Sequence, residues 1–380
     1  MHGARNIGGG EYSIYFLIKN LRRDIFEPLV LYSNENEIIK KLREDQINLI
    51  NIPLSEKITS IYRDEIKKNP LSLLIYAWHL IDGIVEVVKI LKKYKIEILH
   101  PHDNLSKIIG GLAAKIAGVK AVTHNRDILK KSFIERILKF YQLIFMDKII
   151  AVSESSRNLF KIGKKIPDKV QIIYSAVDLA QFDFRKKGFD RKELGIHENN
   201  IVLGIIGVFD KCKGHIYLFQ AIEMLISEGL KNIICLVIGA GRERDELKSF
   251  IRNKNLQDYI KFLGYRTDIP ELLKAMDVVV MPSIQESFGR VAIEAMAMKV
   301  PVIASATGGL PEIIEDGKTG MLIPPADIGS LSKSIKYLIE NPEIRKKMGE
   351  AGRKRVKERF TIENDVSKTE ELYLDLLTDG

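Results

Sequence analysis

Residues 281–327 read MPSIQESFGRVAIEAMAMKVPVIASATGGLPEIIEDGKTGMLIPPAD. An apolar run that ends at Met281 passes through a polar loop into a helical pattern that begins near Gly289, and a second short apolar run follows at 301–304. Short β-rich runs that alternate with helical segments are typical of βαβ units in parallel sheets. This stretch therefore predicts a strand–helix–strand unit of an α/β protein.

The same alternation extends over the whole chain of 380 residues. The predicted strands are 28–33, 47–52, 96–100, 119–124, 148–153, 170–174, 201–207, 233–239, 260–263, 277–281, 301–304 and 321–323. A polar, charged stretch at 183–200 interrupts the pattern, and the length suits two domains of roughly 150 residues. We therefore predict two Rossmann-like domains, 1–182 and 201–358, with a linker region at 183–200 and a final helix at 359–380 that crosses back to the first domain.

The start of the chain departs from this scheme. A Rossmann-like domain normally opens with a strand that leads into a glycine-rich loop, yet Gly8, Gly9 and Gly10 arrive almost at once. We interpret the first strand as missing or short, from a truncated or misassigned start. Because that strand is central in a doubly wound sheet, its loss would leave a neighbour without a partner on each side.

Loops that follow parallel strands are where ligands of such sheets bind. Glu286 lies in one such loop and Glu294 lies one turn inside the helix after it, whose first backbone N–H groups, at 288–290, form an anion site. A diphosphate fits there, with the two carboxylates available for sugar or ribose hydroxyls. The spacing alone is equally compatible with two solvated surface charges.

A second candidate anion site is the loop 206–215, IGVFDKCKGH. Lys213 stands at a helix start, where the helix dipole disfavours a cation unless an anion binds. The alternative is an ordinary turn with a solvated lysine. The nearby pair Gly239 and Gly241 is no dinucleotide fingerprint, because Arg244 occupies the place of the third glycine.

Two histidines, His102 and His124, follow or end successive predicted strands of the first half. Single histidines are usually structural, but two at adjacent strand ends are placed to act on a ligand.

Several of these stretches resemble the retaining GT-B glycosyltransferases of family 4. The signature residues are ESFGRVAIEAMA, PVIA and GGLPEIIEDGKTG in the quoted segment. The resemblance implies that Glu294 binds the nucleotide ribose, that Glu286 contacts the donor sugar, and that the backbone of Phe288 and Gly289 surrounds sugar and phosphates. It also implies two Rossmann-like domains that face each other across a cleft.

Other motifs extend the resemblance. Residues 206–215 are similar to the G-R-L-x-x-x-K-G motif, in which Lys213 would clamp the donor diphosphate, but Val208 stands in the arginine position and Lys211 is a candidate substitute. The loop with Tyr265 and Arg266 is implied to lie against the base. In the first domain, the G-G-x-E loop would approach the donor, and His124 would lie near the reacting sugar.

These implications give the predicted site. The catalytic candidates are Glu286, His124, Lys213 and His102. The donor-binding candidates are Gly9, Gly10, Gly207, Lys211, Gly241, Tyr265, Arg266, Phe288, Gly289, Arg290 and Glu294. No D-x-D motif occurs, so we expect neither a metal nor another cofactor.

The function implied is retaining transfer of a sugar from a nucleotide sugar, in first place a UDP-sugar, to a glycan or lipid-linked acceptor in cell-envelope polysaccharide or lipopolysaccharide synthesis. Two alternatives stay open. One is a nucleotide-sugar epimerase or hydrolase on the same fold, and the other is a non-catalytic GT-B binding subunit.

The net charge of +9 comes from one half of the chain. The first 180 residues hold 29 Lys and Arg against 20 Asp and Glu, whereas the remaining 200 hold 30 of each. This one-sided excess suggests an anionic acceptor or membrane surface rather than nucleic acid, although a solvated basic face would look the same.

The basic amphipathic pattern at 128–145 fits a helix in a lipid interface or a core helix with a solvated face. The N-terminus has no signal-peptide pattern, the apolar stretch 71–91 contains charges that argue against a membrane span, and the two cysteines, Cys212 and Cys235, suggest no disulfide framework. We expect a cytoplasmic protein, peripheral at the inner face of the membrane.

Overall fold

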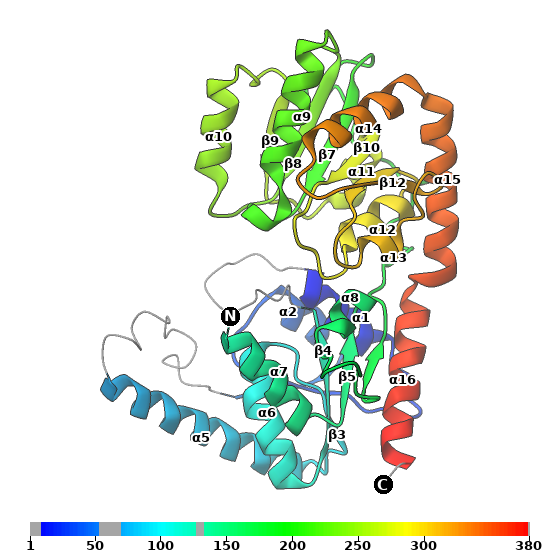
Figure 1. Ribbon diagram of the computed structural model, residues 1–380. Coiled ribbons are helices and arrows are strands. Elements are labelled where there is room, and N and C mark those ends of the chain that lie inside the picture. Colours follow the sequence, from blue (N-terminus) through cyan, green and yellow to red (C-terminus); the bar gives the residue numbers. More distant parts are fainter. Residues whose placement is uncertain (1–8, 53–69, 127–132, 379–380) are drawn as a thin grey trace. The chain divides into compact units, whose positions relative to one another are not determined.

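The computed structural model describes residues 9–52, 70–126 and 133–378 (Figure 1). The chain forms two compact units. The first consists of Met1–Val152, Arg157–Ile173 and Asp365–Gly380, and the second of Ser153–Ser156 and Tyr174–Asn364.

The stretch proposed as a linker, 183–200, lies within the second unit. The Arg191 guanidinium donates to the backbone oxygen of Ala275 at 3.0 Å and to the Asp277 carboxylate at 2.9 Å. Ile196 is buried as well. These contacts attach the stretch to the segment directly before the strand Val278–Met281. The main division of the chain falls earlier, between Ile173 and Tyr174.

The second unit has one parallel sheet of six strands in the order β12-β11-β10-β7-β8-β9. The strands are β7 (Ile201–Ile206), β8 (Ile233–Ile238), β9 (Ile260–Gly264), β10 (Val278–Met281), β11 (Val302–Ser305) and β12 (Gly320–Ile323). This is the doubly wound order, in which the first strand, β7, lies between the second and the fourth. The continuous apolar runs of these strands are buried because helices cover both faces of such a sheet.

The helical segments of the second unit follow the strands along the chain. They are η1 (Lys211–Lys213), α9 (His215–Ser227), α10 (Arg244–Asn253), α11 (Ile269–Ala275), α12 (Arg290–Ala297), α13 (Leu310–Ile313), α14 (Ile328–Glu340) and α15 (Pro342–Arg359). The last helix, α16 (Ile362–Thr378), belongs to the first unit from Asp365 onward.

The first unit is also parallel α/β, but its strands form two separate sheets. The strands are β1 (Leu29–Tyr32) and β2 (Asn48–Asn51) in one sheet, and β3 (Ile98–Leu99), β4 (Lys120–Asn125), β5 (Lys148–Ala151) and β6 (Val170–Ile172) in the other. The helices are α1 (Gly9–Asn20), α2 (Glu37–Glu44), α5 (Pro70–Lys93), α6 (Asn104–Ala117) and α7 (Phe133–Phe145). The short α8 (Glu154–Asn158) is divided: it belongs to the second unit up to Ser156 and to the first unit from Arg157.

The predicted fold class, α/β with two Rossmann-like domains, is confirmed by these two units. Within the described residues the chain starts with α1, not with a strand. The prediction of a missing or short first strand concerns residues 1–8, which lie outside the described residues. In the parts of the chain that the structure describes, no helix has both the length and the apolar character needed to cross a membrane.

Candidate active site

Lys213 and Glu286 form an ion pair at the carboxyl ends of the strands in the six-stranded sheet of the second unit. The Nζ of Lys213 lies 2.7 Å from Oε2 of Glu286, and the Glu286 side chain is only 7% exposed. Lys213 comes from η1, which follows β7, and Glu286 from the loop after β10. Two residues predicted from separate motifs are therefore neighbours.

The backbone fixes these two loops against each other. The N–H of Ile284 donates to the backbone oxygen of Cys212 at 2.8 Å. Gly214 ends η1 with a φ of 70°, and a Cβ there would lie 2.0 Å from the backbone oxygen of Pro282. Glycine alone adopts this positive φ without strain and leaves room for the Pro282 oxygen. Gly214 is therefore needed for the Lys213–Glu286 contact.

The second predicted carboxylate, Glu294, lies in α12 beside Arg290, whose Nη2 is 3.1 Å from Oε1 of Glu294. The helix begins after Gly289, which has a φ of 110° and gives no side-chain cap. Phe288 is buried. The start of α12 thus offers backbone N–H groups and a paired carboxylate on one short segment, as a diphosphate and a ribose require.

A third loop, after β8, packs against the loop after β7. The Phe209 N–H donates to the backbone oxygen of Ala240 at 3.0 Å, and a Cβ on Gly241 would lie 2.4 Å from the Phe209 oxygen. Gly239 approaches equally closely, since its Cβ would lie 1.9 Å from the oxygen of Gly207. The glycines at 239 and 241 therefore serve loop packing, which accounts for their spacing without a nucleotide.

Arg242 brings a cation to this region that the sequence analysis missed. Its Nη2 lies 2.6 Å from Oδ2 of Asp210, whose other carboxylate oxygen caps η1 through the Cys212 N–H at 3.1 Å. Val208, in the usual arginine position, is 61% exposed. A sequence feature that could have indicated Arg242 is its position directly after Gly239-Ala240-Gly241. That loop packs beside the loop that leads to Lys213.

Three other predicted donor-binding side chains are those of Arg266, Tyr265 and Lys211. Arg266 pairs with the carboxylate of Asp268, with Nε 2.7 Å from Oδ1, and lies over the ring of Phe189. Tyr265 is 42% exposed and Lys211 is exposed in η1. Donor binding by these three residues stays a prediction.

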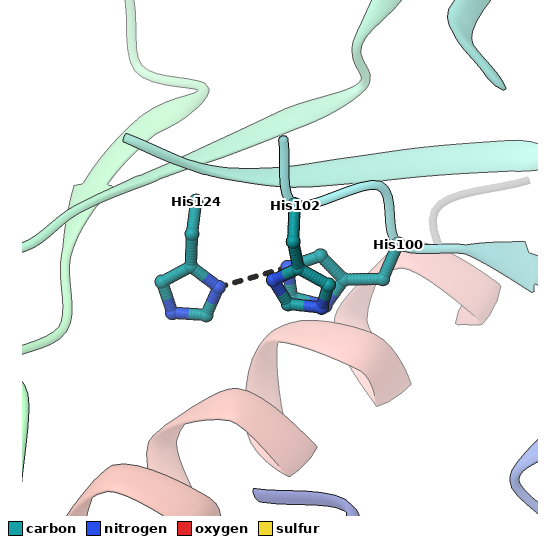
Figure 2. Close-up of side chains that lie close together, drawn as sticks. All are labelled: His100, His102 and His124. Atoms are coloured by element: carbon teal, nitrogen blue, oxygen red, sulfur yellow. Dashed lines mark hydrogen bonds between the residues drawn. The ribbon is translucent and has the colours of Figure 1, made fainter. Parts of the chain in front are cut away.

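The histidines of the first unit form a cluster of three (Figure 2). Nδ1 of His124 lies 2.9 Å from Nε2 of His100, and the two rings are within 2° of parallel. The His102 ring stacks on that of His100, with centroids 4.3 Å apart. His100 thus joins the two predicted histidines. It lies two residues before His102 and was not among the predicted site residues.

Further groups surround the cluster. Tyr373, from α16, places its hydroxyl 2.5 Å from Nδ1 of His100. Nη1 of Arg126 lies 3.2 Å from Nδ1 of His102. Tyr373 lies 273 residues along the chain from His100, so no sequence signal could have identified it.

Burial keeps the cluster neutral. It lowers the pKa of His100 to about 3, and Arg126 and Lys107 add to the effect. The pKa values of His102 and His124 lie well below the usual histidine range, chiefly because of burial. Uncharged imidazoles can donate or accept a hydrogen bond at neutral pH, but they bring no positive charge.

The three histidines form a hydrogen-bonded cluster that could also offer nitrogen ligands to a metal ion. One nitrogen of each histidine lies within 4.8 Å of the others, and a metal needs three lone pairs that converge at about 2.0–2.1 Å. Here His124 and His100 face each other, and Nδ1 of His102 faces Arg126. Which nitrogens keep a lone pair for a metal therefore depends on the tautomers of the three rings.

The predicted glycine loop of the first unit lies at the start of α1, which begins at Gly9. A Cβ at Gly10 would have no heavy atom within 4 Å. Glu11 lines a cavity of about 760 Å³ together with His100 and His102. Among the described residues no contact demands glycine at position 10, and its donor-binding role stays a prediction.

Comparisons with known proteins agree with this arrangement. The family model for glycosyl transferases group 1 matches residues 186–355, and the model for glycosyltransferase family 4 matches residues 7–181. An N-acetyl-alpha-D-glucosaminyl L-malate synthase of Bacillus anthracis is 30% identical, over 86% of this chain and 87% of its own.

Two further similarities concern a relative and a solved structure. The UDP-Gal:alpha-D-GlcNAc-diphosphoundecaprenol alpha-1,3-galactosyltransferase of Escherichia coli is 28% identical, over 78% of this chain and 79% of its own. HepE of Anabaena in complex with UDP-glucose aligns with a TM-score of 0.81 at 24% identity, over 98% and 97% of the two chains. Since both halves match family models and a relative of 30% identity spans most of the chain, this protein is a family 4 glycosyltransferase with the GT-B fold.

Proposed function

We propose that the protein transfers a hexose-type unit from a UDP-sugar, with retention of configuration, to a glycan or lipid-linked acceptor of the cell envelope. The E. coli relative is named for a UDP-sugar and a diphosphoundecaprenol acceptor. HepE binds UDP and UDP-glucose in its structures. These names support the donor and acceptor classes that the resemblance implies.

The observation that carries the proposal is the Lys213–Glu286 pair. The ammonium group is held at the carboxyl end of the sheet by a carboxylate that is almost fully buried. When a donor binds, the diphosphate offers Lys213 a second anionic partner, and Glu286 can accept a hydrogen bond from a sugar hydroxyl. The pair therefore prepositions both groups before the leaving diphosphate develops its charge.

We infer that this charge is met without a metal. Lys213 and Arg242 supply two cations on adjacent loops, and the start of α12 supplies backbone N–H groups. An activity that persists in excess chelator, and that added divalent ions do not raise, agrees with this proposal. Loss of activity on chelation, restored by one metal, contradicts it.

For the acceptor we propose the first unit, with His124 as the group nearest the reacting sugar and His102 as its neighbour. Both imidazoles are uncharged. They would orient oxygen atoms by hydrogen bonding. In the front-face scheme usual for this family, donor and acceptor react on the same side of the sugar, and the departing phosphate helps to accept the proton of the acceptor.

We also propose that the first unit binds an anionic membrane surface through α7. Ile137, Phe140 and Ile144 are 52%, 63% and 53% exposed, and their spacing of three and seven places them along one side of the helix. Arg136 is exposed next to them. Apolar side chains on the exposed side of α7 favour a helix that lies in a lipid interface over a core helix with a solvated face. Residues 128–132 of the predicted segment lie outside the described residues.

The decisive experiment combines ligand binding and transfer. A thermal-shift panel of UDP, GDP and ADP with their hexose derivatives identifies the donor, because a ligand that binds the folded state raises its apparent stability. Transfer from that donor is then measured for the wild type, Glu286→Ala and Lys213→Ala. Full transfer by both variants contradicts the assignment of the site. Donor turnover that needs no acceptor indicates the epimerase or hydrolase alternative instead.

A further inference from the structure

The loop that carries Glu286 is held by hydroxyl groups at two of its backbone oxygens. Oγ1 of Thr307 donates to the backbone oxygen of Ile284 at 3.2 Å. Oγ of Ser153 donates to the backbone oxygen of Ser287, the residue directly after Glu286, at 2.7 Å. The Ser153 side chain is fully buried, so water does not compete for this second bond.

The Ser153 hydroxyl has one proton, and its surroundings direct that proton to Ser287. The residue opens the segment Ser153–Ser156, which belongs to the second unit. The Ser156 N–H donates to Oγ of Ser153 at 3.0 Å and so occupies one of its lone pairs. Oγ of Ser156 also lies 3.0 Å from Oγ of Ser153, but the Ser287 oxygen is closer, at 2.7 Å. The shorter contact makes the Ser287 carbonyl the acceptor.

One carboxylate holds the backbone of this segment in place. Oε2 of Glu312, in α13, accepts from the Glu154 N–H at 2.9 Å, and Oε1 accepts from the Ser155 N–H at 3.3 Å. The Tyr174 hydroxyl donates to Oε2 at 3.1 Å. Because three donors of the second unit meet on this carboxylate, the backbone beside Ser153 has little freedom to turn the hydroxyl away from its acceptor.

The bond to the Ser287 oxygen also sets the direction of an N–H group. The Ser287 carbonyl and the Phe288 N–H belong to one planar trans peptide, so they point in opposite directions. Among the described residues, the Phe288 N–H donates to no backbone acceptor. It lies directly before the start of α12, where the proposed function places the donor diphosphate. A carbonyl that accepts a hydrogen bond also polarises its own peptide, which strengthens the N–H as a donor.

Phe288 itself is fixed by packing. Its ring stacks on that of Tyr174, with centroids 5.9 Å apart, and meets the Phe360 ring edge-on at the same distance. A Cβ on Gly309 would lie 2.9 Å from Cα of Phe288, so the backbone of the next loop approaches closely. A peptide beside a fixed residue can still rotate about its own axis, and the Ser153 bond opposes that rotation.

We propose that Ser153 is a positioning residue for the donor diphosphate. Its hydroxyl holds the peptide between Ser287 and Phe288 so that the Phe288 N–H faces a phosphate oxygen. Ser153 is fully buried and acts through this peptide, without touching the donor. The inference rests on the proposed binding of a nucleoside diphosphate at the start of α12.

The test measures UDP binding together with the Phe288 amide. Ser153→Ala removes the hydroxyl and should raise the Kd for UDP about tenfold in calorimetry, because a well-aimed bond to a charged group is weakened. In protein labelled with nitrogen-15 at phenylalanine, UDP should move the Phe288 amide proton of the wild type downfield as a charge-assisted bond forms. The same proton should move clearly less far in Ser153→Ala. Phe288→Leu identifies the signal.

Ser332→Ala is the matched control. Ser332 is another serine of the second unit, in α14, and its side chain is also buried. This variant should bind UDP like the wild type and show the same amide shift. Loss of a buried hydroxyl can lower the melting temperature of either variant, but a merely structural role would not change the Phe288 shift. If Ser153→Ala does not fold, Ser153→Cys, which keeps a weaker S–H donor, should show an intermediate shift.

The outcomes separate this proposal from the proposed function. If UDP binds both proteins and moves the Phe288 amide equally in the wild type and in the Ser153 variant, the positioning role is wrong and the donor site stands. Equal losses of affinity in Ser153→Ala and Ser332→Ala would also overturn the positioning role. If the wild type binds neither UDP, GDP nor ADP, the donor site itself is refuted, and the role of Ser153 is refuted with it.

Discussion

Nδ1 of His124 lies 2.9 Å from Nε2 of His100, and Nδ1 of His100 lies 2.5 Å from the hydroxyl of Tyr373. Burial raises the pKa of Tyr373, so its phenol keeps its proton. His100 Nδ1 is the hydrogen-bond partner that the structure gives this hydroxyl among the described residues. If the phenol donates there, His100 carries its proton on Nε2 and donates to His124, which then carries its own proton on Nε2.

The first prediction concerns this chain of hydrogen bonds. Tyr373→Phe removes the donor to His100, so His100 and His124 should populate both neutral tautomers instead of one. Nitrogen chemical shifts of protein labelled in its histidine rings report the tautomer directly. Tyr141→Phe is the matched control, because the Tyr141 hydroxyl is bonded to the backbone oxygen of Ile108 instead. Unchanged histidine shifts in Tyr373→Phe would show that the tyrosine does not set the tautomer.

The second prediction concerns acid stability. Because burial lowers the pKa of His124, the unfolded state binds more protons than the folded state once the pH falls below about 6.5, and the free energy of unfolding decreases. Each such histidine contributes up to about 1.4 kcal/mol per pH unit. His124→Gln should therefore flatten the loss of stability between pH 6.5 and pH 5, measured by urea denaturation at each pH. His197→Gln, at an exposed position, is the control, and an equal flattening there would refute the explanation.

The third prediction separates stability from catalysis at the ion pair. Lys213→Met leaves the carboxylate of Glu286 without its cation at a site only 7% exposed, which should cost about 1–3 kcal/mol of unfolding free energy. The double variant Lys213→Met, Glu286→Gln removes both charges and should recover most of that loss. Transfer should fall about 100-fold or more in both proteins, because the diphosphate and sugar contacts are lost. Recovery of transfer in the double variant would mean that the pair has only a structural role.

The fourth prediction concerns Arg242, which binds Asp210 with its side chain 69% exposed. If it replaces the arginine absent at Val208, Arg242→Ala should weaken binding of the nucleoside diphosphate about tenfold. Adding Val208→Arg to that variant should restore the affinity, as calorimetry can measure. Arg244→Ala, an exposed arginine two residues along, should bind normally. Equal losses in both alanine variants would point to general charge rather than to a specific contact.

The fifth prediction concerns the membrane surface. Phe140, on α7, is 63% exposed. Phe140→Ser should lower flotation with anionic liposomes about tenfold, because a buried aromatic side chain contributes roughly 1.5–3 kcal/mol. Tyr337→Ser, at an exposed position of the second unit, should float like the wild type. Equal flotation of the wild type with neutral and anionic liposomes would remove the proposed electrostatic attraction.

Much of the fold could be predicted from the sequence. Each of the twelve strands that the structure describes overlaps a predicted strand, because short β-rich runs bounded by polar loops are a local pattern. The loops with Lys213 and Glu286 could be placed at strand ends for the same reason. Because the strands are parallel, the loops after their carboxyl ends lie at the same end of the sheet.

Contacts between distant residues were decided by the tertiary structure alone. Lys213 and Glu286 are 73 residues apart, and His100 and Tyr373 are 273 apart. No local periodicity encodes which side chains meet when separate elements pack. Tyr373 was missed for that reason.

The first unit shows both sides of this division. The sequence alone determined that it holds six short strands. Only the tertiary structure decided that these strands pair in two separate sheets, β1 with β2 and β3 to β6 in the other, with a cavity lined by β1 and β3. The physical reason is that hydrogen bonds between parallel strands are made by a neighbour in space, and a local pattern cannot say which strand that neighbour is.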